Sequence, residues 1–332
     1  MQGNKPLLET RNLTKRYSVR SGNLFTSIFR DEQYLTAVDD VPFQIGEGEI
    51  VGLAGQSGCG KSTLGELLLA LQNPTSGDIL FDGQDITENS SDEMKEFRRR
   101  AQFIFQDPYQ SLNPRYTVGR TVIEPLKIHD LGGPEEREER AIKALEDAGL
   151  GSPQEHLGSL PSELSGGQRQ RVAIARALVL DPDFLIADEP VSMLDVSIST
   201  GILNRLKQLQ QEKNITVLYI SHDLGTIKYL TDRTMIMYLG DIVEMGETAD
   251  LIESPAHPYT ESLLAAVPSG DPNKKRGGSN MSASIDDPIN LPKGCRFHPH
   301  CDYRTEECTE DEPLVEAVSE DRYAACYHPL NE

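Results

Sequence analysis

Residues 55–63 read GQSGCGKST, a stretch that fits the pattern G-x-x-x-x-G-K-[ST] of a phosphate-binding loop. The apolar residues 49–54 (EIVGLA) predict a strand before the loop, and residues 64–72 (LGELLLALQ) predict a helix after it. This order is the context that the pattern requires, because glycines let backbone N–H groups wrap a phosphate at a helix N-terminus. The alternative, a glycine-rich turn before a helix, is disfavoured because both flanking elements are present.

The lysine and the hydroxyl side chains of this loop are expected to carry its chemistry. Lys61 is predicted to reach the β- and γ-phosphates of ATP, which makes it a candidate catalytic residue, and the Ser62 hydroxyl is predicted to ligate Mg²⁺. Cys59 occupies a variable position of the pattern, so we assign it no chemistry. The predicted nucleotide contacts in the loop are Gly55, Ser57, Gly58, Gly60, Lys61, Ser62 and Thr63.

Two further predicted strands end in polar residues. Asp188 and Glu189 follow the apolar strand at residues 183–187, where one carboxylate suits a Mg²⁺ contact and its neighbour suits polarising the attacking water. His222 follows the strand at residues 215–220, from which it can reach the γ-phosphate side of the crevice. The alternatives are an acidic pair that caps the next helix and a histidine with a structural role.

The alternation of apolar strands with helical segments predicts an α/β fold built on a parallel sheet that is buried on both faces. Residues 7–53 are β-rich, whereas residues 98–160 carry acidic and basic residues at helical spacing. Residues 268–293 have the Pro, Gly, Ser, Asn and Lys content of a linker. We therefore expect a nucleotide-binding domain at 1–267 with a helical subdomain at about 98–175, a linker at 268–293 and a cysteine-rich extension at 294–332.

The composition limits the classes of protein that this chain can be. The chain has 332 residues, enough for one large domain with an appendage or for two modest domains. Lys and Arg number 32 against 53 Asp and Glu, a formal net charge of -21 that disfavours a general nucleic-acid binder. The acidity suits either a basic partner or a salty cytoplasm, and the even spread of acidic residues favours the second. No apolar run approaches the roughly 20 residues that span a bilayer, and the first residues lack the apolar segment of a secretory signal, so the cytosol is expected.

Four of the five cysteines gather near the C-terminus with the spacing C-x5-C-x6-C-x17-C. Clustered thiols in a cytosolic chain indicate metal binding before disulfides, and four thiolates suit an iron–sulfur cluster or tetrahedral zinc. The spacing differs from the short C-x2-C pairs of common zinc ribbons, and uncoordinated thiols are a third possibility. The four are Cys295, Cys301, Cys308 and Cys326. The neighbouring histidines that could replace a zinc ligand are His298, His300 and His328.

In order and spacing these motifs resemble the ATP-binding-cassette (ABC) family. The deciding segment is residues 164–168, LSGGQ, which stands just ahead of residues 184–190, FLIADEP. Many ATPases have a phosphate loop, but few combine it with this pair of segments. The resemblance implies the α/β fold of a P-loop NTPase in its ABC-cassette form, with an N-terminal antiparallel β region, a helical subdomain and a small cysteine-rich C-terminal appendage.

The resemblance also assigns roles to single residues. Asp188 becomes the Walker B aspartate that contacts Mg²⁺, Glu189 the catalytic glutamate and His222 the catalytic switch histidine. Gln106 becomes the Q-loop glutamine, another Mg²⁺ and nucleotide contact. Tyr17 falls where the family stacks an aromatic ring on adenine, although the insertion after it changes the spacing.

The signature segment is expected to contact the nucleotide that a second cassette binds. A serine and two glycines that open a helix form an anion site, and in the family this site meets the γ-phosphate held by the partner cassette. Asp195 belongs to SMLD, which differs from the usual SALD by a packing change. The resemblance therefore implies a nucleotide-sandwich dimer, with partner-side contacts at Ser165, Gly167, Gln168 and Asp195.

Four longer segments look like the ATPase subunits of oligopeptide/dipeptide importers, and the insertion after Tyr17 and AVDDV at 37–41 favour their F type. That family implies a distinct paralogous ATPase as heterodimer partner, two membrane permease subunits, an external substrate-binding protein, a place on the cytoplasmic face of the membrane, and a [4Fe–4S] cluster on the four cysteines. The alternatives are an importer of sugars or nickel and a soluble ABC ATPase without transport, which usually has two cassettes or coiled-coil insertions. The four segments are 105–115 (FQDPYQSLNPR), 188–198 (DEPVSMLDVSI), 237–246 (MYLGDIVEMG) and 257–268 (HPYTESLLAAVP).

Overall fold

The computed structural model describes residues 6–19, 33–266 and 288–331. Residues 20–32, most of the insertion after Tyr17, and most of the predicted linker at 268–293 therefore lie outside the described residues. The chain groups into two compact units, which we treat separately. The signature unit contains Ile45–Ile50 and Glu88–Ile220, and the phosphate-loop unit contains Leu8–Gln44, Val51–Thr87 and Ser221–Glu332.

The signature unit contains a group of parallel strands. β6 (Ala101–Ile104), β7 (Phe184–Asp188) and β8 (Thr216–Ser221) pair side by side, with Phe103 opposite Ile186. All five residues of β7 are buried, which explains its continuous apolar sequence. The strands predicted at 183–187 and 215–220 are confirmed to within one residue. The helical pattern predicted from residue 98 is wrong at 101–104, because a short buried apolar run cannot be assigned by periodicity.

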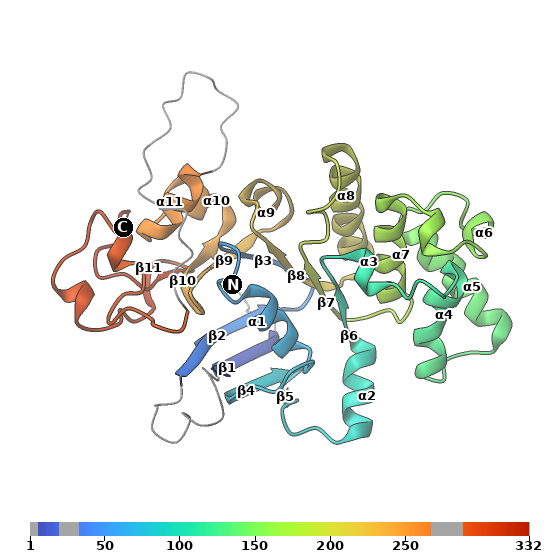
Figure 1. Cartoon of the computed structure of the whole chain (residues 1–332), viewed down its shortest axis with the longest axis horizontal. Coiled ribbons are helices and arrows are strands. Elements are labelled where there is room, and N and C mark those ends of the chain that lie inside the picture. The colour runs from blue at the N-terminus through green and yellow to red at the C-terminus, as the bar shows by residue number, and fades with distance from the viewer. Residues whose placement is uncertain (1–5, 20–32, 267–287, 332) are drawn as a thin grey trace, which may run out of the picture. The chain divides into compact units, whose positions relative to one another are not determined.

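Helices make up the rest of this unit. α4 (Val118–Ile128), α5 (Pro134–Asp147) and α7 (Gly166–Leu178) contact one another and appear as the green group in Figure 1. α7 buries the consecutive residues 172–175, which point to different sides of the helix, so it lies at the centre of this group. The other helices are α2 (Ser91–Arg100), α3 (Pro108–Ser111), α6 (Pro153–His156), the short 3-10 helix η1 (Pro161–Glu163) and α8 (Val196–Lys213).

The first sheet of the phosphate-loop unit has the strand order β2-β1-β4-β5. β1 and β4 are antiparallel, with Leu8 opposite Phe81, as are β4 and β5. The predicted N-terminal antiparallel region is thus confirmed. The strands are β1 (Pro6–Val19), β2 (Gln33–Gly46), β4 (Ser76–Phe81) and β5 (Gln84–Asp85).

A second group of strands in this unit joins distant parts of the chain. β3 (Ile50–Ala54) pairs in parallel with β9 (Arg233–Tyr238), which pairs antiparallel with β10 (Asp241–Glu247). The cysteine-rich tail, residues 288–331, adds β12 (Arg322–Ala324) beside β10 and then β11 (Glu316–Ser319). These two strands were not predicted from the sequence.

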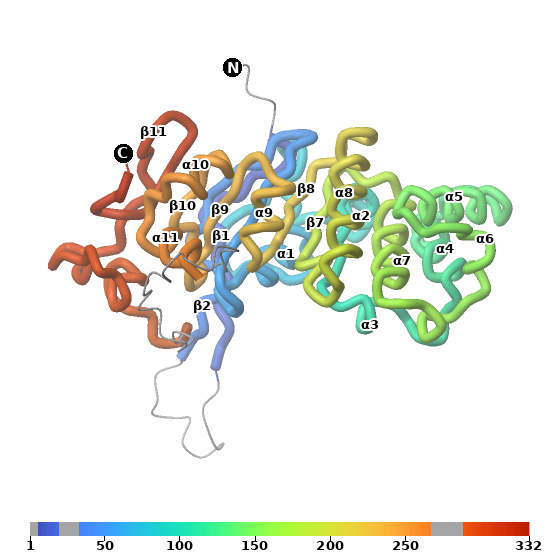
Figure 2. Tube along the Cα trace, turned by 90° about the horizontal axis from the view of Figure 1, so that it is seen from above, coloured from blue at the N-terminus to red at the C-terminus, as the bar shows by residue number. Residues whose placement is uncertain are grey.

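Short helices complete the phosphate-loop unit, and Figure 2 shows the red tail beside the orange segment that contains β10. Among the residues that the structure describes, no helix is long and apolar enough to cross a membrane. The helices are α1 (Lys61–Leu68), α9 (Leu224–Leu230), α10 (Thr248–Glu253), α11 (Pro258–Ala265), and the 3-10 helices η2 (His298–His300) and η3 (Glu307–Thr309).

Candidate nucleotide site

The phosphate loop leaves the buried strand β3 and ends at α1, as its sequence predicts. Gly60 has a φ of 112°, and a Cβ added there would lie 2.0 Å from the carbonyl oxygen of Ala37 in β2. Only glycine fits this position, because the backbone conformation is left-handed and the neighbouring strand is too close for a side chain. The glycine at position 60 therefore allows the loop to pack directly against β2.

Lys61 is the first residue of α1 and is 6% exposed. Its ammonium donates hydrogen bonds to the carbonyl oxygens of Gly55 and Gln56, each at 2.8 Å. Ser62 follows at the exposed start of the helix, with Thr63 half-buried beside it. Positive charge, a hydroxyl and the free N–H groups of a helix start are thus gathered at one loop, which is the chemistry of an anion site.

Two predicted nucleotide residues of this unit lie outside the loop. Tyr17 in β1 is half-buried, its hydroxyl donates to Gln72 Oε1 at 2.6 Å, and the Lys15 ammonium lies 5.1 Å from its ring centroid. His222 is exposed and comes directly after Ser221, the last residue of β8.

The acidic pair of the signature unit occupies the end of β7. Asp188 is its last residue and is 5% exposed, and Glu189 follows with a φ of 45°. The Glu189 N–H donates to the carbonyl of Ile220 at 2.9 Å, and its carboxylate Oε2 accepts from Gln106 Nε2 at 2.9 Å. The structure therefore brings together the predicted Q-loop glutamine and the predicted catalytic glutamate.

The signature segment begins α7. Ser165 caps this helix, because its hydroxyl accepts from the Gln168 N–H at 3.3 Å while the Gln168 side chain accepts from the Ser165 N–H at 2.9 Å. A Cβ added to Gly167 would lie 2.7 Å from Ile198 Cγ2 in α8. The signature residues thus have a local structural role besides the predicted one.

Asp195 also caps a helix. Its Oδ1 accepts from the Ile198 N–H at 3.0 Å and from the Ser197 hydroxyl at 2.6 Å, which fixes the start of α8. The hydrogen bond from Ser197, followed by that from Ile198, lowers the pKa of the Asp195 carboxyl. The side chain is therefore an anion whose oxygens are partly engaged.

The four tail cysteines line one cavity of about 20 Å³ in the phosphate-loop unit. Burial raises the pKa of Cys295 and of Cys326 to about 11, and the neighbouring thiols add to both shifts. Within residues 6–19, 33–266 and 288–331, no three His, Cys, Asp or Glu side chains form a group that could hold a metal ion. The histidines that line the cavity are His257, His298 and His328, whereas the predicted alternative ligand His300 does not line it.

The sequence matches two family profiles. Residues 38–192 match the ABC transporter family, and residues 243–308 match the C-terminal region of oligopeptide/dipeptide transporters. This chain belongs to the ABC transporter family. A putative peptide import ATP-binding protein of Brucella ovis is 45% identical to it, over 97% of this chain and 97% of that protein.

Further relatives and a solved structure agree with this assignment. The dipeptide transport ATP-binding proteins DppF of Haemophilus influenzae and Escherichia coli are each 42% identical to this ABC protein, over 98% and 94% of its chain and 97% and 91% of theirs. The ATP-binding cassette MJ0796, solved as a dimer with ADP and Pi, matches with a TM-score of 0.64 and 32% identity, over 73% of this chain and 98% of that one. The predicted cassette fold and the predicted importer family are confirmed, and the chain is an ATPase that couples hydrolysis to transport.

Proposed function

We propose that this ABC ATPase drives the import of oligopeptides or dipeptides. The observation that carries the proposal is the occurrence, in one chain, of the cassette profile at 38–192 and the oligopeptide/dipeptide C-terminal profile at 243–308. The names of the relatives, which concern peptide or dipeptide transport, point the same way. Sugar or nickel import and a role outside transport have no such support.

In this proposal the phosphate-loop residues bind the phosphates, and Glu189 with Gln106 activates the attacking water. Lys61 neutralises the β- and γ-phosphates, and backbone N–H groups at Gly58 and Gly60 cradle them. Glu189 orients and polarises the attacking water, and Gln106, which donates to its carboxylate, keeps that carboxylate in place.

The remaining assignments complete the nucleotide site. Bound Mg²⁺ would neutralise phosphate charge, with Ser62, Asp188 and Gln106 as its protein contacts. The buried position of Asp188 at a strand end and the exposed hydroxyl of Ser62 at a helix start both suit such a role. Tyr17 stacks on the adenine and His222 contacts the γ-phosphate. Loop contacts at Gly55, Ser57 and Thr63 complete the set.

The protein is proposed to act as part of a larger complex. Ser165, Gly167, Gln168 and Asp195 contact the nucleotide of a second, distinct ATPase subunit, so that two ATP molecules are held between two cassettes. Two permease subunits hold this pair at the cytoplasmic face of the membrane, and an external binding protein delivers the peptide. The dimeric state of the related cassette MJ0796 supports the sandwich.

The cysteine cavity is proposed to hold a [4Fe–4S] cluster, with zinc as the alternative. The ligands would be the four cysteines, which all line one cavity, although the described residues form no preassembled metal-binding group. Such a cluster would tie four positions of the tail together, which supplies the folding energy that a short segment lacks.

Changing Glu189 to Gln tests the catalytic assignment. The variant should bind Mg-ATP as the unmodified protein does but hydrolyse it about 100-fold or more slowly, because the base is lost while the phosphate contacts remain. Nucleotide binding and phosphate release are measured, with E139Q on the exposed face of α5 as the matched control. K61A should lose ATP binding. Unchanged hydrolysis in E189Q would refute the role of this carboxylate.

The metal content of the tail is a separate measurement. Anaerobic purification followed by iron, sulfide and zinc analysis should give about four irons and four sulfides per chain if a [4Fe–4S] cluster is present. Replacing Cys308 by Ser should lower the iron content, with C59S as the control thiol outside the tail. Zinc alone, or no metal, would contradict the cluster while leaving the ATPase assignment intact.

A further inference from the structure

A buried tyrosine of α11 forms a hydrogen bond with the phosphate loop. Tyr259 is 0% exposed, and its hydroxyl accepts a hydrogen bond from the Gln56 N–H at 3.0 Å. Gln56 is the second residue of the loop, and its carbonyl oxygen accepts from the Lys61 ammonium. The Tyr259 hydroxyl therefore fixes one face of the residue whose carbonyl receives the loop lysine.

The cysteine-rich tail reaches this tyrosine through an aromatic cluster. The ring of Phe297 lies 5.5 Å from the ring of Tyr259 and 5.5 Å from that of Tyr238, both in edge-to-face geometry, and the two tyrosine rings are 4.5 Å apart. Phe297 is 3% exposed and lines the cavity of the four cysteines. Edge-to-face packing of buried rings fixes their orientations, so the position of Tyr259 depends on the tail.

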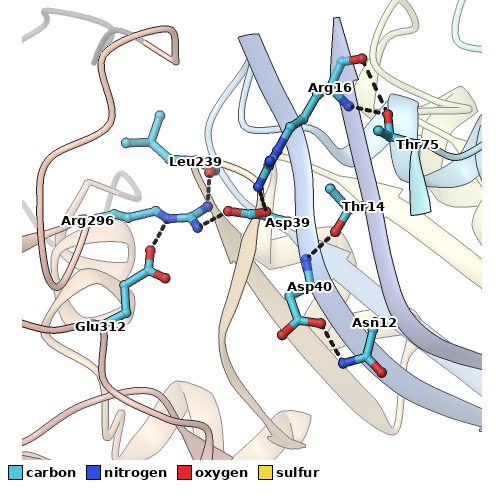
Figure 3. Close-up of polar contacts among 9 residues, drawn as sticks. All are labelled: Asn12, Thr14, Arg16, Asp39, Asp40, Thr75, Leu239, Arg296 and Glu312. Atoms are coloured by element: carbon cyan, nitrogen blue, oxygen red, sulfur yellow. Dashed lines mark hydrogen bonds and ion pairs between the residues drawn. The ribbon is translucent and has the colours of Figure 1, made fainter. Parts of the chain in front are cut away.

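Arg296, the residue before Phe297, makes the polar contacts drawn in Figure 3, and these lead to a second point of the loop. Arg296 donates to the Leu239 carbonyl at 2.6 Å and forms ion pairs with Asp39 at 2.6 Å and Glu312 at 2.9 Å. The next residue in the turn, Gly240, donates its N–H to the carbonyl of Cys59 in the phosphate loop at 2.8 Å. Arg296 and Phe297, two consecutive residues of the tail, are therefore linked to two residues of the phosphate loop, Cys59 and Gln56.

We propose that Tyr259 is a positioning residue for nucleotide binding, and that the cysteine-rich tail supports it through Phe297. A loop whose backbone is already fixed loses less conformational entropy when it binds phosphate, so fixing Gln56 raises the affinity for ATP. The inference rests on the proposed role of the phosphate loop. It assigns to the tail an effect on ATP affinity that is exerted through Phe297 and Tyr259.

The Y259F variant tests the inference, because it removes the hydroxyl and keeps the ring. The dissociation constant for Mg-ATP, measured on the full chain, should rise about 3- to 10-fold, the loss expected for one hydrogen bond. The KM for ATP should rise in the same proportion and kcat should stay nearly constant, since Tyr259 touches the loop and none of the reacting groups. The matched control is Y303F, which removes an exposed tyrosine hydroxyl of the tail that bonds Glu261.

A double-mutant cycle tests the part played by the tail. F297L should also weaken ATP binding, and its effect should nearly vanish when Y259F is already present, because both act through one hydroxyl. Equal affinity of Y259F, Y303F and the unmodified protein would overturn the inference, and fully additive effects would overturn the role of Phe297. The K61A variant distinguishes a failure of this inference from a failure of the proposed function. If K61A kept full ATP affinity, the proposed function of the loop itself would be wrong.

Discussion

Glu189, the proposed catalytic glutamate, shows how several contacts position a single side chain. Its φ of 45° lies in the left-handed region, which disfavours a residue with a Cβ by about 1–2 kcal/mol. The backbone hydrogen bond to Ile220 offsets part of this strain, and the hydrogen bond from Gln106 restrains the carboxylate. A strained position held in this way suits a group that must orient a water molecule.

Asp241, at the start of β10, is the residue for which the structure predicts a clear pH effect. Burial raises the pKa of its carboxyl to about 7 although Arg296 acts in the opposite direction. A folded-state pKa above the unfolded value stabilises the protein at pH values below the unfolded pKa, and this contribution is lost as the pH rises through about 7. D241N should therefore raise the melting temperature relative to the unmodified protein at pH 8, and the difference should shrink near pH 5.

The pKa of the neighbouring His257 is shifted in the opposite direction, so the contribution of Asp241 has to be isolated by comparing variants. Burial lowers the pKa of His257 to about 3, so its contribution to stability is lost as the pH falls below the ordinary histidine value. The difference between D241N and the unmodified protein removes this background. D311N, at an exposed tail position, is the control, and a pH-independent difference for D241N would contradict the assignment.

Short motifs in the sequence predict the individual residues of the proposed site, because each pattern carries its own chemistry. Lys61 and Ser62 follow from the loop, and Glu189 from the end of an apolar strand. Tyr259 and Arg296 could not be found in this way, since Tyr259 contacts a residue 203 positions away and Arg296 one 57 positions away. Such contacts leave no local pattern.

At the scale of elements, the C-terminal strands likewise depend on long-range contacts that leave no local sequence pattern. β12 has three residues and joins β10 through pairs such as Glu244 with Ala324, so its existence depends on a strand about 80 positions earlier. β6 lies at the start of the region predicted as helical, and its four residues are too few to show the period of a strand. The longer strands β7 and β8 were predictable, since each is a buried apolar run with a polar end.

A buried ion pair fixes β12 in its place. Glu244 is 0% exposed and its carboxylate accepts from the Ala256 and His257 N–H groups and from Arg322 at 2.9 Å. Removing one partner of such a pair leaves an uncompensated buried charge, so R322M should lower the free energy of unfolding by about 3–5 kcal/mol. Urea unfolding measures the change.

The control for this prediction is an exposed ion pair of the other unit. Lys95 and Asp130 are 3.0 Å apart with side chains 46% and 81% exposed, so K95M should change the free energy of unfolding by less than about 1 kcal/mol. If R322M were as mild as K95M, the buried pair would not hold the tail strand. The double variant E244Q/R322M should recover part of the loss, because no unpaired charge remains.

At the scale of the whole molecule, the excess of acidic residues is the dominant feature. A formal net charge of -21 makes the folded chain repel itself, and salt screens this repulsion over a Debye length that falls from about 10 Å at 0.1 M to about 3 Å at 1 M. The sequence left two explanations open, a basic partner and a salty cytoplasm. They differ in what salt does to the isolated protein.

Adaptation to a salty cytoplasm predicts that the melting temperature and the ATPase rate rise between 0.05 and 1 M KCl, because screening relieves repulsion that the fold must otherwise overcome. A variant with Glu135, Glu136, Glu138 and Glu139 of α5 changed to Gln should show a smaller rise, since it carries four fewer negative charges. These side chains are exposed, so their loss leaves the packing unchanged. A melting temperature that stayed flat or fell with KCl would exclude salt adaptation, and the acidic surface would then be better explained by a basic partner, whose binding salt weakens.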